Sequence, residues 1–285
     1  MTVSTTKKIY FTLGIISIIT IWYVSSLIVN NSGIIPTVNE VLVTLGELLS
    51  ELQTYDMILM TLLKIVISII VSLLISILFA CLSLINYKVE SFIRPIISLF
   101  RTVPVVSIAM IVLIVFFDKD IRYIGTIVIA TTVIIPIIYE GILTGFKTIN
   151  SNIIDSTKLL SNINLTVLFN IHIPLAMPSI ITSLIQSFGL GLKVLVMSEV
   201  IVNPPNSIGR LIGEYASYGE LSYVFSWTII LVLIVVLFDV LLKKIKKQLL
   251  QSQQTLIQAY FFQYLKNLHY LILQGRHALM NGQSW

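Results

Sequence analysis

Apolar residues fill long, nearly unbroken stretches of this chain, and polar residues gather in the short segments between them. A run of about 20 apolar residues is long enough for a helix to cross the ~30 Å hydrocarbon core of a bilayer. Most of these runs are apolar all round, whereas a core helix of a soluble protein would show a polar face at helical period. The pattern predicts six membrane-spanning helices, near residues 9–29, 65–85, 94–117, 121–143, 179–203 and 221–242.

The first run also resembles a signal peptide, because Lys7 and Lys8 precede it. The apolar part of a signal peptide is typically about 7–15 residues long and is followed by small residues. Residues 9–29 exceed that length, carry Trp22 and Tyr23, and lack a clear small-residue cleavage site. We therefore expect this run to be a retained first helix.

Composition supports an integral membrane protein. Only 11% of the 285 residues are charged and 56% are apolar, whereas about 25% are charged in an ordinary soluble domain. The mean hydropathy is +0.98. The surroundings of this chain are therefore predicted to be the lipid bilayer.

Basic residues gather in alternate segments between the predicted spans, which indicates the orientation of the chain. With both termini in the cytoplasm, the positive-inside rule is obeyed, because the cytoplasmic segments then hold Lys7, Lys8, Lys88, Arg94, Arg101, Lys147, Lys158, Lys243, Lys244, Lys246 and Lys247. The net charge of +5 is explained by this topology. It does not indicate a nucleic-acid partner.

Two spans contain helix-bending prolines, Pro104 in the third and Pro136 in the fourth. Proline inside a membrane helix leaves a carbonyl group unpaired and bends the axis, so we expect a kink at each position. After Pro136, Gly141 and Gly145 form a GxxxG pair. Such a pair permits close helix packing, although a chance pair of glycines is an alternative.

The fifth span carries three polar residues, Gln186, Lys193 and Glu199. Ionisable residues inside a span are costly and usually face a bundle interior or an aqueous cavity. Lys193 and Glu199 are six residues apart, too far round the helix for a close pair, so each is expected to find another partner or water. Two interpretations remain open: these residues shape or gate a solute pathway, or they hold neighbouring helices in register.

No catalytic, metal or cofactor site is predicted. Asp239 and Glu140 are isolated, whereas a membrane enzyme would need clustered reactive side chains at one depth. Cys81 is the single cysteine, and the histidines do not occur at metal-ligand spacing; they are His172, His269 and His277.

A polar, helix-forming segment lies between two very apolar spans, at residues 154–178, and contains Pro174 and Pro178 near its end. Membrane chains normally keep their loops short, so we interpret this segment as a docking device for another protein. A surface hairpin without a partner is the alternative.

This segment resembles a known loop motif, which in its family reads Glu-Ala-Ala, three residues, Gly, and a long spacer to Leu-Pro. The corresponding positions here are Asp155, Ser156 and Thr157, then Ser161, with Ile173 and Pro174 closing the motif. The chain resembles the membrane-spanning permease subunit of a binding-protein-dependent ATP-binding-cassette importer, particularly the nitrate, sulfonate and taurine branch. The likeness covers about 35–245, and its supporting stretches are 33–42, 99–117 and 189–201.

The resemblance implies an all-α membrane protein, a six-helix bundle of the type I importer permease kind, with a cytoplasmic coupling helix between spans four and five. The predicted parts of the chain are an N-terminal segment with the first span, a permease core with its coupling loop at 144–178, and a tail without family counterpart. Their boundaries are 1–34, 35–247 and 248–285.

The implied function is ATP-driven import of a small polar or anionic solute, such as a sulfonate, nitrate, taurine or a vitamin precursor, by alternating access. The implied partners are a cytoplasmic ATP-binding subunit, which hydrolyses the ATP, an extracytoplasmic substrate-binding protein and a second permease copy, in a bacterial or archaeal plasma membrane. The residues implied to couple to the ATPase are Asp155, Ser156, Thr157, Leu160, Ser161, Asn162 and Pro174.

The departures from the motif have a physical meaning. Ser161 stands where the loop usually turns on glycine, and serine costs roughly 1 kcal/mol in a left-handed turn unless Asn162 takes that position. Asp155 keeps the negative charge of the motif's glutamate. The alternative function is a stand-alone secondary transporter, which should show inverted repeats; none is visible in the sequence.

Overall fold

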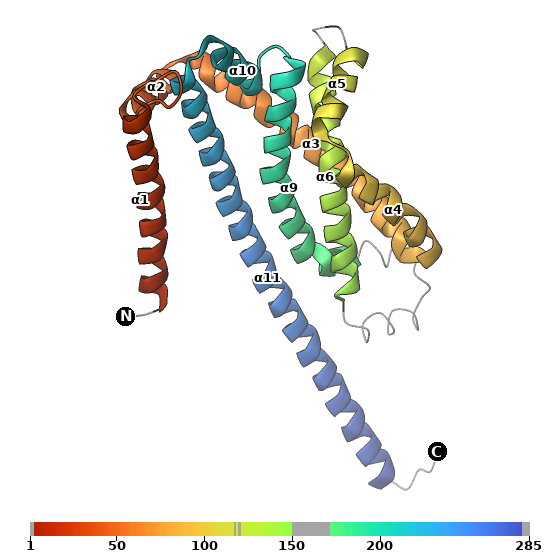
Figure 1. Cartoon of the computed structure of the whole chain (residues 1–285). Coiled ribbons are helices and arrows are strands. Elements are labelled where there is room, and N and C mark those ends of the chain that lie inside the picture. The colour runs from red at the N-terminus through yellow and green to blue at the C-terminus, as the bar shows by residue number, and fades with distance from the viewer. Residues whose placement is uncertain (1–2, 117, 119–120, 150–171, 281–285) are drawn as a thin grey trace. The chain divides into compact units, whose positions relative to one another are not determined.

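The computed structural model describes residues 3–116, 118, 121–149 and 172–280. Within these ranges the chain forms helices and no strand (Figure 1), which confirms the predicted all-α fold. The helices are α1 (Val3–Val29), α2 (Val38–Ser50), α3 (Leu52–Ile85), α4 (Tyr87–Thr102), α5 (Val105–Val115), α6 (Arg122–Lys147), α9 (Ile173–Val202), α10 (Ile208–Tyr218) and α11 (Leu221–Met280).

Five helices are long and apolar enough to cross a membrane, and they include α6 and α9 over their whole length. The other three candidate spans are Ile9–Val29 of α1, Leu52–Leu84 of α3 and Leu221–Gln248 of α11. The short helices α2 and α10 lie together at one end of the bundle, and the last turn of α6 and the first turn of α9 lie at the opposite end (Figure 1). α6 ends at Lys147 and α9 begins at Ile173. We call these two ends of the bundle the α10 end and the Lys147 end.

The predicted third span, 94–117, is broken rather than kinked. α4 and α5 meet at 88° and make a sixth span only if the bent pair is counted as one. Val103 and Pro104 both adopt extended backbone conformations between the two helices. Proline lacks the N–H group of a helical residue and disfavours helix in the residue before it, so the helix ends here. α5 alone, with 11 residues, is about 16 Å long and too short to cross.

A ladder of serine hydroxyls joins α3 to α6. Ser68, Ser72 and Ser76 lie one turn apart and are fully buried. Their Oγ atoms donate to the carbonyl oxygens of Ile127, Thr131 and Ile135 of α6, at 3.3, 3.2 and 3.0 Å respectively. The Ser68 hydroxyl shares its proton with the Lys64 carbonyl of its own helix, at 2.9 Å. Small polar residues suit such interfaces because they allow the helices to approach closely and bond across. We call the three bonds to α6 the serine ladder.

Glycines bring α6 close to α9. A Cβ atom on Gly141 would overlap the side chain of Ser183, and one on Gly145 would approach the Cβ atoms of Ala176 and Ser179 at 2.9 and 3.0 Å. The GxxxG pair of the sequence therefore lies in a tight helix contact. α3, α6 and α9 together supply most of the main apolar core.

A capping box begins α2. The Thr37 side chain accepts a hydrogen bond from the Glu40 N–H, and the Glu40 carboxylate accepts from the Thr37 N–H at 2.8 Å. The Ser32 hydroxyl donates to the same carboxylate at 2.8 Å. The bond from the Thr37 backbone, followed by that from Ser32, lowers the pKa of Glu40 below its ordinary value. The ionised carboxylate is thus the form that fits this turn.

α1 touches the bundle mainly near its C-terminal end. Trp22 stacks on Phe225 of α11 with ring centroids 5.5 Å apart, and its indole N–H donates to the Pro36 carbonyl at 3.1 Å. Only 6% of the apolar window of α1 is buried. Most of this helix therefore faces its surroundings.

The chain divides into two compact units, Met1–Asp239 and Val240–Trp285. α11 ends at Met280, so the described part of the second unit is helical. The predicted tail, 248–285, falls inside this unit, and the predicted division into three parts stays a prediction.

Candidate functional site

α9 is buried on most of its surface and exposes one narrow stripe. From Gln186 to the end of the helix, five side chains are exposed, and they recur every three or four residues: Gln186, Leu190, Lys193, Met197 and Val200. Residues spaced in this way lie on one face of a helix. We call them the α9 stripe, and it carries two of the three polar residues that the sequence singles out in this span.

Lys193 lies in the middle part of the α9 stripe. Within the described residues its ammonium group makes no hydrogen bond or ion pair. It borders a groove of about 390 Å³ between α9 and α11, whose other lining residues are apolar except Thr228. A lysine at this depth costs at least about 2.5–3.5 kcal/mol on insertion scales. Such a cost is avoided if the stripe faces water or a polar ligand instead of lipid.

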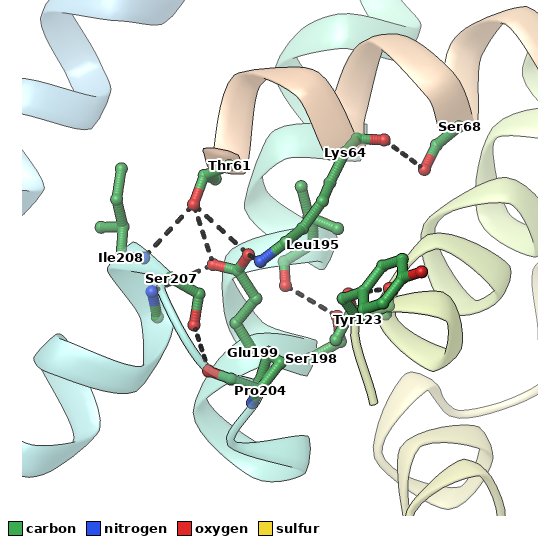
Figure 2. A network of polar contacts seen from close by, with 12 residues as sticks. Thr61, Lys64, Ser68, Tyr123, Leu195, Ser198, Glu199, Pro204, Ser207 and Ile208 are labelled. Carbon is green, nitrogen blue, oxygen red and sulfur yellow. Dashed lines mark hydrogen bonds and ion pairs between the residues drawn. The ribbon is translucent and has the colours of Figure 1, made fainter. Parts of the chain in front are cut away.

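Glu199, in contrast, faces away from the stripe and is fully buried. Its carboxylate pairs with the ammonium group of Lys64 from α3, at 2.8 Å between Nζ and Oε1 (Figure 2). The Thr61 hydroxyl lies 3.3 Å from both carboxylate oxygens. The side chains of Lys64 and Glu199 are 8% and 0% exposed, so the two charges are removed from solvent together.

The N-terminus of α10 completes this network. The Gly209 N–H donates to Glu199 Oε2 at 3.0 Å, and the Ile208 N–H donates to the Thr61 hydroxyl at 3.2 Å. A Cβ atom on Gly209 would overlap the Val196 carbonyl, so this position needs glycine for the close approach. One carboxylate therefore ties α3, α9 and α10 together at the α10 end, and we call Thr61, Lys64, Glu199, Ile208 and Gly209 the Glu199 network.

The two predicted kink prolines occupy different environments. Pro104 lies at the break between α4 and α5. Pro136 is buried inside a continuous α6, and its carbonyl accepts a hydrogen bond from Arg101 Nη2 at 3.1 Å. Arg101 therefore lies beside the middle of α6. The assignment of Arg101 to a cytoplasmic segment stays a prediction.

The predicted coupling residues from Asp155 to Asn162 lie outside the described residues. The described chain resumes at His172, and Pro174 is the second residue of α9. Proline is well tolerated in the first turn of a helix, where its missing N–H would be unpaired in any case. Pro174 therefore lies where the segment 150–171 joins α9.

Sequence reasoning missed two residues of this region, Lys64 and Arg101. Lys64 directly precedes the predicted span 65–85, whereas α3 begins at Leu52 and therefore contains Lys64. Its partner Glu199 is 135 residues away in the chain. The sequence does show two isolated opposite charges, Lys64 beside an apolar run and Glu199 within one. Because a charge in a membrane span needs a counter-charge, a pair between them could have been predicted.

A family model described as "Binding-protein-dependent transport system inner membrane component" matches residues 72–251. Among curated proteins, none matches the chain. Two solved structures of inward-facing conformations of the MetNI methionine ABC transporter are similar in fold. For the CY5 SeMet soak crystal form the TM-score is 0.58 at 15% identity, covering 68% of this chain and 93% of that chain. For the CY5 native form the TM-score is 0.55 at 14% identity, with the same coverage.

Proposed function

Because this chain belongs to the family of binding-protein-dependent transport system inner membrane components, we propose that it forms one half of the solute pathway of an ATP-driven importer. The family match includes α6, α9 and α10, which carry or border the α9 stripe. The fold is that of a type I importer permease. The chain is a transport subunit and not an enzyme, and ATP hydrolysis belongs to a separate chain.

The observation that supports the pathway most directly is the exposure of Lys193 within a membrane span. A second copy of the permease would cover the α9 stripe and enclose it in a water-filled passage. Gln186 and Lys193 then face the solute, and Lys193 favours one that carries a negative charge. Glu199 contributes to gating through the Glu199 network, since it links α9 to α10 near the mouth of the passage.

The charges support one orientation. Arg94 and Lys147 lie at the Lys147 end, so the positive-inside rule favours a cytoplasmic location for that end. A cytoplasmic ATP-binding subunit would dock on the segment around residues 155–162, and Pro174 would transmit its movement to α9. The α10 end then faces outward, where the substrate-binding protein delivers the solute. A sulfonate, nitrate, taurine or a vitamin precursor remains our proposal for the solute class.

Purification of the tagged chain from its native membrane tests this proposal. We expect a co-eluting ATPase whose association and coupled ATP hydrolysis are lost in Asp155→Lys and Ser161→Trp. Asp56→Lys is the matched control, because it makes the same charge reversal at an exposed position of the α10 end. Elution of the chain without any ATPase in mild detergent, or equal loss in the control, would contradict the proposal and favour a secondary transporter.

A further inference from the structure

An open cavity of about 420 Å³, largely apolar but with charged and hydroxyl side chains in its lining, lies between α4, α6 and α9. Side chains of opposite charge line it, Arg101 from α4 and Glu140 from α6, together with Gln186 from the α9 stripe. Four hydroxyl side chains also line it, those of Thr144, Ser179, Thr182 and Ser183. The volume lies within the range of sites for small ligands. We call this space the α4–α6–α9 cavity.

Arg101 reaches deep into the membrane region. Its guanidinium donates to the carbonyl of Pro136, which is 11 residues before the end of α6 at Lys147, or about 16 Å along the helix axis. Yet the Arg101 side chain is exposed, and within the described residues it makes no second hydrogen bond. A guanidinium group has five N–H donors in a planar fork suited to carboxylate or sulfonate oxygens. Most of these donors are available to a ligand.

Glu140 supplies the opposite charge at the same cavity. One carboxylate oxygen lies 3.7 Å from an Arg94 nitrogen, and the side chain is 29% exposed. The other oxygen has no hydrogen-bond partner within the described residues. Gln186 is exposed and makes no side-chain hydrogen bond within them either. Its amide can both donate and accept.

Resting on the proposed function, we propose that the α4–α6–α9 cavity binds the transported solute, and that this solute is a small zwitterion. Its acidic group would bind the free donors of Arg101, and its ammonium group would bind Glu140. An anion without an ammonium group would lie beside Glu140, whose partner within the described residues, Arg94, is 3.7 Å away and shared with Glu90. A simple cation would leave Arg101 without a counter-charge. Gln186 joins this cavity to the α9 stripe, so the solute would reach it by moving along α9 from Lys193.

A cysteine placed in the cavity would report on binding. Cys81 is buried and is the single cysteine of the chain, so Cys81→Ala with Thr144→Cys leaves one exposed thiol in the cavity. The permease with its associated ATPase would be placed in nanodiscs of phosphatidylglycerol, which has no zwitterionic headgroup. The rate of labelling by a charged thiol reagent would then be measured with β-alanine, propionate and propylamine, which share a three-carbon skeleton.

We expect β-alanine to slow labelling several-fold and the other two probes to have little effect. Arg101→Gln and Glu140→Gln should each raise the β-alanine concentration needed for protection about tenfold or more, because each removes a charge-assisted contact. Lys88→Gln, which removes an exposed charge from the first turn of the same helix α4, is the matched control. Protection by propionate or propylamine equal to that by β-alanine, or none by any probe, would overturn the proposal.

Two further measurements separate the possible failures. In the first, the labelling is repeated without β-alanine in nanodiscs that contain phosphatidylethanolamine. Slower labelling in these nanodiscs would assign the cavity to a lipid headgroup and overturn solute binding. ATP hydrolysis by the co-purified ATPase is measured on the same samples. If ATP hydrolysis is retained but β-alanine does not slow the labelling, solute binding in the cavity is refuted and the importer function is not. If no ATPase co-purifies, the importer function is refuted.

Discussion

Glu199 shows how a single carboxylate can be buried in this bundle. Three donors from two other helices surround it, the Lys64 ammonium, the Thr61 hydroxyl and the Gly209 N–H. Removing one partner of a buried ion pair leaves an uncompensated charge, which is more costly than losing both. The network therefore constrains which substitutions the α10 end tolerates.

The first prediction concerns this pair. Lys64→Met should lower the free energy of unfolding by about 3–5 kcal/mol, because it leaves the Glu199 carboxylate without its counter-charge. Adding Glu199→Gln should restore part of the loss, since glutamine is neutral and its carbonyl oxygen still accepts from Gly209. Thermal or denaturant unfolding in detergent measures this effect on four proteins: the unchanged chain, the two single variants and the double variant. If the double variant is no more stable than Lys64→Met, the lost counter-charge is not the cause of the destabilisation.

A surface pair provides the comparison. Arg210 and Glu214 of α10 lie 3.9 Å apart, and both side chains are close to half exposed. Exposed pairs contribute at most about 1 kcal/mol. Arg210→Met should therefore change the unfolding free energy far less than Lys64→Met does.

The second prediction concerns Glu40 and pH. Hydrogen bonds to its carboxylate lower the pKa of Glu40 in the folded chain. The stabilisation of α2 is therefore fully present above the ordinary glutamate pKa and is lost as the pH falls through the lowered, folded pKa. The protection of amides in the first turn of α2, measured relative to intrinsic exchange at each pH, should fall over that window. Glu40→Gln should remove this pH dependence, while Glu47→Gln on the same helix should keep it.

Among the helices, α3 and α6 are joined by bonds whose spacing equals one helical turn. The serine positions 68, 72 and 76 are visible in the sequence, and their four-residue spacing could have predicted a polar face on an otherwise apolar span. Their acceptors are backbone carbonyls, which no side-chain pattern marks. The register between the helices was therefore not predictable.

The third prediction tests the serine ladder. Ser72→Ala should lower the unfolding free energy by about 0.6 kcal/mol, the average for a hydrogen bond between membrane helices, and replacing all three serines should cost roughly three times as much. Ser17→Ala is the control, because its exposed hydroxyl bonds only within α1, to the Leu13 carbonyl. An effect no larger than that of the control would show that the ladder contributes nothing measurable.

The long helices were easier to predict than their ends. The runs near 121–143 and 179–203 correspond to α6 and α9, because long apolar segments leave few alternatives to a spanning helix. The prediction of a continuous third span was wrong for a local reason. Pro104 was expected to bend a helix, but it lies at a break between two helices. Hydropathy alone does not separate these outcomes, since both sides of the break are apolar.

For the whole molecule, the question is which exposed apolar surfaces face lipid and which face water. Leu74 of α3 is 64% exposed, and Leu190 of the α9 stripe is 44% exposed. Both are leucines on long helices, so exposure does not distinguish them. Lys193 does, because a charge on the same stripe as Leu190 indicates an aqueous surrounding.

The fourth prediction follows from this difference. In a Cys81→Ala background, Leu190→Cys and Met197→Cys should react with a water-soluble maleimide, because maleimides react with the thiolate, which forms in water. Leu74→Cys, which is at least as exposed, should remain unlabelled in lipid nanodiscs. If the stripe cysteines react as slowly as Leu74→Cys, the α9 stripe faces lipid and the proposed pathway lies elsewhere.

The serine ladder has a further consequence. Because its rungs repeat every four residues, sliding α6 by one turn along α3, about 5.4 Å, would offer each of the three hydroxyls a new backbone carbonyl of α6. The ladder by itself is therefore compatible with two discrete positions, as in a ratchet. What singles out the observed one is contacts without a repeat, such as the bond of 3.0 Å between Ser83 and the Tyr139 hydroxyl. If these non-repeating contacts were lost together, the serine ladder alone would not distinguish the two positions of this helix pair.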